Sequence, residues 1–135
     1  MPNMETKQLD VAAAAFLGDA VYEAYVRKHI VAGGAIRGAD ALHRAAVRYV
    51  RAEGQAAVVR GLPEGFLSAE EQEILRRGRN KRTGTKSRSA DPVSYHLATA
   101  LEALIGQLVL TGRQQRAEEI MAMAIGIIDE KERSQ

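Results

Sequence analysis

The chain has 135 residues, a length that suits one domain whose core removes roughly two thirds of the unfolded surface from water. Hydrophobic residues make up 46% of it, much of this alanine, with only six aromatic residues and no tryptophan. Such small and aliphatic side chains favour closely packed helices over a sheet. The chain has no cysteine, which excludes disulfides and thiolate metal sites.

The N-terminal residues 1–10 are polar and lack the basic and then apolar pattern of a signal peptide. We see no apolar run approaching the ~18 residues needed to span a bilayer. We therefore expect a cytoplasmic protein with one domain over residues 1–135, flexible at its polar N-terminus and charged C-terminal tail.

Helical periodicity predicts an all-α fold, with helices over residues 9–31, from 40 onward, 68–79, 92–110 and 113–129. The pair Gly33-Gly34 is a natural stop for the first helix. The second either continues past Gly54 or breaks near it. Ser68 and Glu71 form a capping-box pattern, and Pro92 suits a first helical position, capped by Ser89 or Asp91.

Two of these apolar helices carry isolated acids. Asp19 and Glu23 are the only charged residues between Val11 and Val26, and Glu102 is the only carboxylate of the helix after Pro92. An unpaired, buried carboxylate is costly, so each acid either pairs with an arginine, caps a helix, or converges with the others on a hard cation such as Mg²⁺. Gly18 and Gly106, near these acids, would allow the two helices to approach closely.

The positive charge is concentrated in one segment. Seven basic residues and no acidic one lie between residues 74 and 90, which leaves 12 basic against 17 acidic residues elsewhere. Arginine, hydroxyl and glycine amide groups suit phosphate oxygens, while the lack of aromatic residues disfavours stacking on unpaired bases. The pattern indicates either a solvated loop or a surface for the backbone of a nucleic-acid duplex. The candidate RNA-binding residues are Arg76, Arg77, Arg79, Asn80, Lys81, Arg82, Thr83, Lys86 and Arg88.

Two stretches together resemble the ribonuclease III family. The stretch 16-FLGDAVYE-23 is similar to its signature helix, and 97-LATALEALIGQLVL-110 to its second acidic helix. Their separation, the basic segment 76-RRGRNKRTGTKS-87 and the lack of an appended double-stranded-RNA-binding domain resemble the Mini-ribonuclease III subfamily. The resemblance covers nearly the whole chain.

The resemblance implies a homodimeric, all-α endoribonuclease that cuts double-stranded RNA with Mg²⁺ and leaves short 3′ overhangs. The subfamily role it implies is maturation of the bacterial 23S ribosomal RNA precursor, with a ribosomal protein as a candidate partner that presents the RNA. It also implies that Asp19 and Glu102 are catalytic magnesium ligands and that a metal-bound water is the nucleophile.

The match departs from the full-length enzymes at two positions. Ala15 and Thr99 stand where those enzymes carry a glutamate and an aspartate, so two of four carboxylates are missing. We hypothesise that Glu23 supplements the metal site, although it could equally pair with a basic side chain. The apolar face around Phe16, Val21 and Tyr25 is the candidate dimer interface. The alternative functions are a non-catalytic RNA-binding or ribosome-assembly protein on the same fold, and a helical interaction module without nucleic acid.

Overall fold

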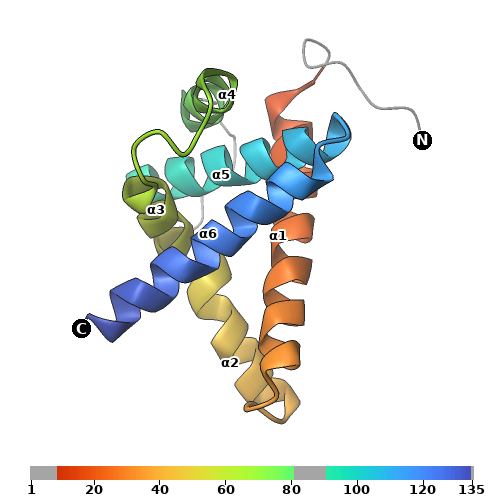
Figure 1. Cartoon of the computed structure of the whole chain (residues 1–135), viewed down its shortest axis with the longest axis vertical. Coiled ribbons are helices and arrows are strands. Elements are labelled where there is room, and N and C mark those ends of the chain that lie inside the picture. The colour runs from red at the N-terminus through yellow and green to blue at the C-terminus, as the bar shows by residue number, and fades with distance from the viewer. Residues whose placement is uncertain (1–8, 81–90, 135) are drawn as a thin grey trace.

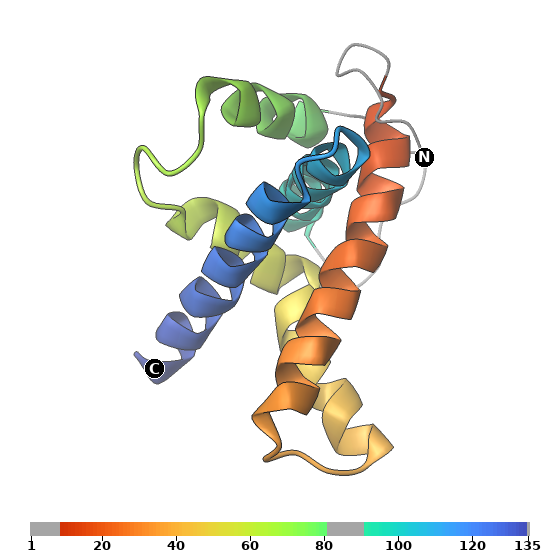
Figure 2. The same cartoon turned by 45° about the vertical axis from the view of Figure 1, so that its right-hand side comes forward.

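The computed structural model describes residues 9–80 and 91–134, which form six helices and no strand (Figures 1 and 2). This confirms the predicted all-α class. The helices are α1 (Val11–Gly33), α2 (Ala39–Val50), α3 (Ala52–Gly61), α4 (Ala69–Asn80), α5 (Pro92–Leu110) and α6 (Gln114–Arg133).

Helix α5 is the centre of the fold, and α1, α3, α4 and α6 all pack against it. In Figure 1, α5 runs across the molecule, with α3 at one of its ends, α1 crossing it toward the other end and α4 above it. By length and composition alone α5 is apolar enough to cross a membrane, so the expectation of no such run was wrong. However, 61% of its most apolar window is buried inside the protein, as befits the central helix of a core.

The predicted caps at the starts of α4 and α5 are confirmed. The Asp91 carboxylate caps α5 by accepting the backbone N–H of Ser94 at 2.8 Å, and Pro92 is the first helical residue. At α4 the capping box is present, because the Ser68 N–H donates to Glu71 at 2.9 Å and the Glu71 N–H donates to Ser68 Oγ at 3.1 Å. Ser89, the other candidate cap, lies outside the described residues.

Of the two alternatives for the second helix, the break is confirmed, and it falls at Arg51, three residues before Gly54. Arg51 is extended, with φ −63° and ψ 156°, and separates α2 from α3. Gly54 lies within α3, where a side-chain carbon would overlap the carbonyl oxygen of Arg48. The glycine therefore lets α3 fold back closely on the end of α2, which is a packing role and not a helix stop.

The last helix extends one turn beyond the predicted end at Asp129 and reaches Arg133. Two contacts with α2 hold this turn. The Tyr49 hydroxyl donates to Asp129 at 2.6 Å, and Arg48 forms an ion pair with Glu132 at 2.6 Å. The predicted helix end near Asp129 was therefore about one turn too early.

Candidate active site

Helices α1 and α5 cross at two glycines. A methyl group on Gly18 would overlap the carbonyl oxygen of Glu102, and one on Gly106 would overlap the carbonyl oxygen of Ala14. The two backbones are thus in direct contact, which only residues without a side chain permit. Because Asp19 follows Gly18 and Glu102 lies one turn before Gly106, the crossing brings the two acids together.

Asp19 and Glu102 line one cavity of about 190 Å³ beside this crossing. Asp19 is exposed and Glu102 is half-buried. The other residues of the wall are small, apolar or uncharged: Ala12, Ala15, Phe16, Tyr95 and Thr99. Among the described residues of this wall there are two acids and no basic side chain, which concentrates negative charge at the site.

The surroundings of the Glu102 carboxyl group disfavour its charged form. Burial is the main cause that raises its pKa, a hydrogen bond from Gln55 lowers it, and the neighbouring Asp19 raises it. Together these effects bring the pKa of Glu102 to about 7. Neither neighbour supplies a positive charge. A bound cation would favour the ionised form of Glu102 and relieve its repulsion with Asp19.

The third residue at the site, Gln55 of α3, was not predicted from the sequence. It is 1% exposed, and its amide nitrogen donates to Glu102 Oε2 at 3.0 Å. A lone glutamine among the alanines and valines of α3 carries no signal in the sequence, because glutamine is an ordinary helix former. Its partner lies 47 residues further along the chain.

Glu23, the proposed supplementary acid, has a basic partner. Its carboxylate accepts a hydrogen bond from Arg27 at 3.1 Å on the exposed surface of α1. Glu23 does not line the cavity that holds Asp19 and Glu102. Within residues 9–80 and 91–134 no cluster of three or more acidic or histidine side chains is present to hold a metal. The metal role of Glu23 stays a prediction.

Ala15 and Thr99 both line the cavity, so the two positions that lack acids face the candidate metal site. Ala15 is 9% exposed. The Thr99 hydroxyl is already engaged, because it donates to the carbonyl oxygen of Tyr95 at 3.0 Å. Neither residue supplies charge, so Asp19 and Glu102 are the two carboxylates of this cavity.

The described part of the basic segment forms the end of α4, where Arg77 and Arg79 lie in the last turn. Arg76 is paired with Glu73 through hydrogen bonds of 2.9 and 2.6 Å, a partner just before the acid-free segment. The remaining candidates, Lys81, Arg82, Thr83, Lys86 and Arg88, lie outside the described residues.

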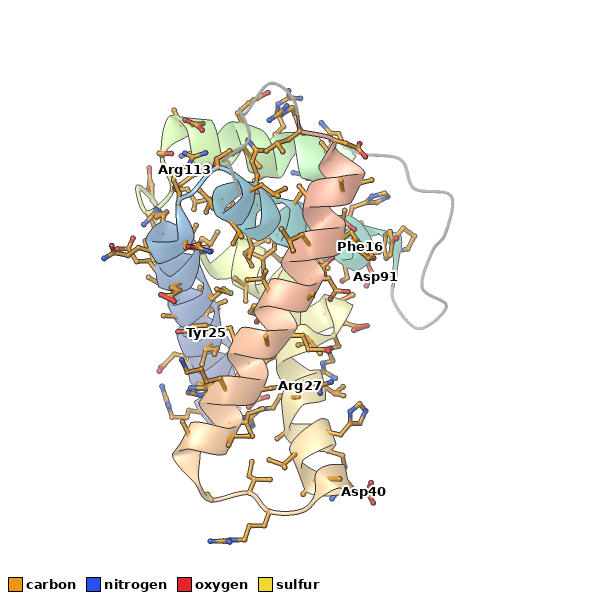
Figure 3. The ribbon with its side chains drawn as sticks, turned by 90° about the vertical axis from the view of Figure 1, so that its right-hand side faces the viewer. Phe16, Tyr25, Arg27, Asp40, Asp91 and Arg113 are labelled. Atoms are coloured by element: carbon orange, nitrogen blue, oxygen red, sulfur yellow. The ribbon has the colours of Figure 1, made fainter. Side chains whose placement is uncertain are left out.

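The candidate dimer residues do not form one face of α1. Figure 3 shows Phe16 and Tyr25 on opposite sides of the helix, as nine residues at 3.6 per turn require. Phe16 is 85% exposed and lies at the rim of the acidic cavity. Val21 and Tyr25 are half-buried and line a different groove, against Val109 and Met121.

The donor set fits a hard divalent cation. Magnesium prefers one or two carboxylates and keeps several waters, and this cavity offers two carboxylates, one of them partly removed from water. A cavity of about 190 Å³ has room for an ion and water. Fold and site together define an all-α domain with paired carboxylates at a helix crossing.

Comparison with known proteins agrees with this class. Residues 12–113 match the ribonuclease III domain family. Proteins called Mini-ribonuclease 3 from Symbiobacterium thermophilum and Brevibacillus brevis are each 44% identical over 115 residues, covering 85% of this chain and 87% and 84% of their own. A crystal structure of a Fusobacterium nucleatum protein superposes with a TM-score of 0.77 at 28% identity, covering 91% of this chain and 98% of that one. The chain belongs to the ribonuclease III family of endoribonucleases, in its Mini-ribonuclease III group.

Proposed function

We propose that this endoribonuclease cleaves double-stranded RNA with Mg²⁺ held by Asp19 and Glu102, and that it matures the 23S ribosomal RNA precursor in the cytoplasm. The observation that carries the proposal is the backbone contact between Gly18 and Glu102, which sets the two carboxylates side by side. The Mini-ribonuclease 3 relatives supply the reaction class.

When bound, Mg²⁺ supplies a Lewis acid that activates water and neutralises charge on the phosphodiester. The chain contributes two things of its own. Asp19 of α1 and Glu102 of α5 would hold the ion, and none of the described residues that line the cavity around them carries a positive charge that would compete with it. Since Glu102 must be ionised to serve as a ligand, its raised pKa makes metal binding stronger as the pH rises toward and past 7.

The RNA grip is proposed to come from the basic segment between Arg76 and Arg88, because it concentrates the positive charge of an otherwise acidic chain. Replacing Arg79, Arg82 and Lys86 with alanine should weaken duplex binding and flatten its dependence on salt, measured as log Kd against log salt concentration. An unchanged slope would count against this segment.

The active form is proposed to be a homodimer that contacts its partner through Phe16. Phe16 is 85% exposed, and phenylalanine is enriched in protein–protein interfaces, so it suits a buried position in a dimer. A stable monomer in sedimentation velocity at working concentration would contradict the dimer. A ribosomal protein that presents the precursor is a further candidate partner.

The deciding experiment incubates the purified protein with long double-stranded RNA in Mg²⁺ and then in EDTA, beside Asp19→Asn and Glu102→Gln. We expect cleavage in Mg²⁺ alone, and a loss of roughly 100-fold or more in each variant, since even residues that only orient a metal ligand are worth about 10–100-fold. The matched control is Glu130→Gln, which removes an exposed acid paired with Arg133 at the far end of α6.

Full cleavage by Asp19→Asn would overturn the proposed site. RNA binding by the wild type without any cleavage would favour the alternative of a non-catalytic RNA-binding protein, which the uncharged side chains at Ala15 and Thr99 make worth testing.

A further inference from the structure

Gln55 joins the break between α2 and α3 to the acidic site. Its amide nitrogen donates one hydrogen bond to the carbonyl oxygen of Val50 at 2.8 Å and one to Glu102 Oε2 at 3.0 Å. Val50 is the last residue of α2, and the extended Arg51 follows it. The break in the helix therefore leaves the Val50 carbonyl free to accept a hydrogen bond from the Gln55 amide nitrogen. The same nitrogen also donates to the Glu102 carboxylate, so two acceptors hold the amide in place.

The orientation of this amide is set by chemistry. Both of its partners are oxygen atoms that accept hydrogen bonds, so only the –NH₂ end can face them. The carbonyl end, Oε1, is buried and has no hydrogen-bond partner among the described residues. Burying an unpaired acceptor is unfavourable, and an apolar side chain of similar shape would avoid this cost. Fold stability alone therefore does not account for a glutamine at this position.

We infer that Gln55 is a positioning residue that holds the Glu102 carboxylate opposite Asp19 for cation binding. The inference rests on the proposed function, because it takes Glu102 as a metal ligand. Gln55 itself lies outside the wall of the acidic cavity and acts through Glu102.

A neutral donor suits this task better than a charged one. An arginine or lysine at position 55 would orient Glu102 but would also neutralise it, and would compete with the metal for its charge. A glutamate would have the same size but would turn an oxygen toward the Val50 carbonyl and the Glu102 carboxylate. An amide orients the carboxylate by hydrogen bonding and leaves its negative charge for the cation, as groups behind metal ligands commonly do.

The test uses Gln55→Met, which keeps the length and shape of the side chain and removes both donors, with Gln55→Leu as a second variant. Gln107→Met is the matched control, because Gln107 is also a buried glutamine, 3% exposed, whose side-chain nitrogen has no partner in the described part of the chain. Mn²⁺ binding to each purified protein without RNA is followed by electron paramagnetic resonance, and thermal unfolding is measured without metal.

We expect Gln55→Met to raise the Mn²⁺ dissociation constant by roughly 10–100-fold, with Gln107→Met within about twofold of the wild type. The Mg²⁺ concentration for half-maximal cleavage should rise by a similar factor, and excess Mg²⁺ should restore part of the rate. Folded Gln55→Met and Gln55→Leu proteins with wild-type Mn²⁺ affinity would overturn the inference, whatever their melting temperature.

Failure of the proposed function has a different signature. In that case the wild type itself would not bind Mn²⁺ more tightly than Asp19→Asn does. If Gln55→Met does not fold while Gln107→Met does, Gln55 is structural and the inference fails as well.

Discussion

Glu71 is buried and Glu102 is half-buried in the same small fold, but the surroundings of the two acids are opposite. Glu71 at the start of α4 is 4% exposed and accepts hydrogen bonds from Arg116 at 2.8 and 2.9 Å and from the Ser68 N–H at 2.9 Å. These partners, Arg116 first, hold the pKa of Glu71 below its ordinary value. The charge of this acid is fully balanced within the chain.

Glu102 has no such basic partner within residues 9–80 and 91–134. A neutral amide donates to it, an acid lies beside it, and burial raises its pKa to about 7. The comparison separates two uses of a buried acid. At Glu71 the chain provides the counter-charge and gains a fixed corner between α4 and α6. At Glu102 none of the described residues provides a counter-charge, and an acid without one beside a second acid makes the α1–α5 crossing a candidate site.

The largest effect should come from breaking the crossing that sets up the acidic site. Gly106→Ala or Gly18→Ala would drive a methyl group into a backbone carbonyl of the facing helix, which cannot move aside as a flexible side chain could. We expect a loss of about 3–5 kcal/mol in the free energy of unfolding, or failure to fold. Urea unfolding measures this loss.

Gly126→Ala in α6 is the matched control, because a methyl group there would meet nothing within 4 Å. It should leave stability unchanged or raise it by up to about 1 kcal/mol, since alanine is the better helix former. Similar losses for Gly126→Ala and Gly106→Ala would show that helix propensity, and not close approach, explains the crossing.

A smaller loss should follow from breaking the balanced corner. Arg116→Met leaves Glu71 buried without its cation and also removes the hydrogen bond from Arg116 to the Phe66 carbonyl at 2.6 Å. We expect a loss of about 2–4 kcal/mol at pH 7, below the full cost of a buried pair because the Arg116 side chain is 26% exposed. Arg133→Met, which breaks an exposed pair with Glu130, should change stability by less than about 0.5 kcal/mol.

The sign of the pH dependence of this corner follows from the lowered pKa of Glu71. The pair contributes its stability above the ordinary pKa of glutamate and loses it as the pH falls through the lowered value. The difference between wild type and Arg116→Met should therefore shrink in acid. A difference that stays constant down to about pH 3 would mean that packing around Phe66, and not the charge of Glu71, is what Arg116 contributes.

The sequence predicted local features better than contacts between distant residues. The capping box at Ser68 and the cap at Asp91 are visible because each depends on residues within one helical turn. The close approach at Gly18 joins two distant helices, and it was predicted because a glycine inside an apolar helix indicates close packing. The convergence of Asp19 and Glu102 was predicted because isolated acids in apolar helices are rare enough to be informative.

What could not be predicted shares one physical cause. The contacts of Gln55 with Glu102 and of Arg116 with Glu71 join residues 47 and 45 positions apart, and ordinary polar residues in a helix give no sign of such partners. The helix break at Arg51 likewise has no proline or glycine at the break itself that would mark it in the sequence. Its place follows from the packing of α3 against α5. Tertiary contacts override local preference in each case.

The smallest of the three effects, and the one with the opposite sign, concerns Glu102 itself. Its folded pKa of about 7 lies above the ordinary value of 4.5, so between these values the folded protein holds a proton that the unfolded chain releases. Without metal, the free energy of unfolding should therefore fall as the pH rises from about 4.5 to about 7, and the full loss should remain above pH 7.

The Glu102→Gln variant cannot ionise at this position, so at pH 8 it should be more stable than the wild type by about 1–3 kcal/mol, and nearly equal to it at pH 4.5. Urea unfolding at both pH values measures this difference. Added Mg²⁺ should stabilise the wild type at pH 8 and leave the variant unchanged, because only an ionised Glu102 can bind the cation and so stabilise the folded state. A difference between the two proteins that is the same at both pH values would mean that the unbalanced charge at the crossing is not the source of the instability.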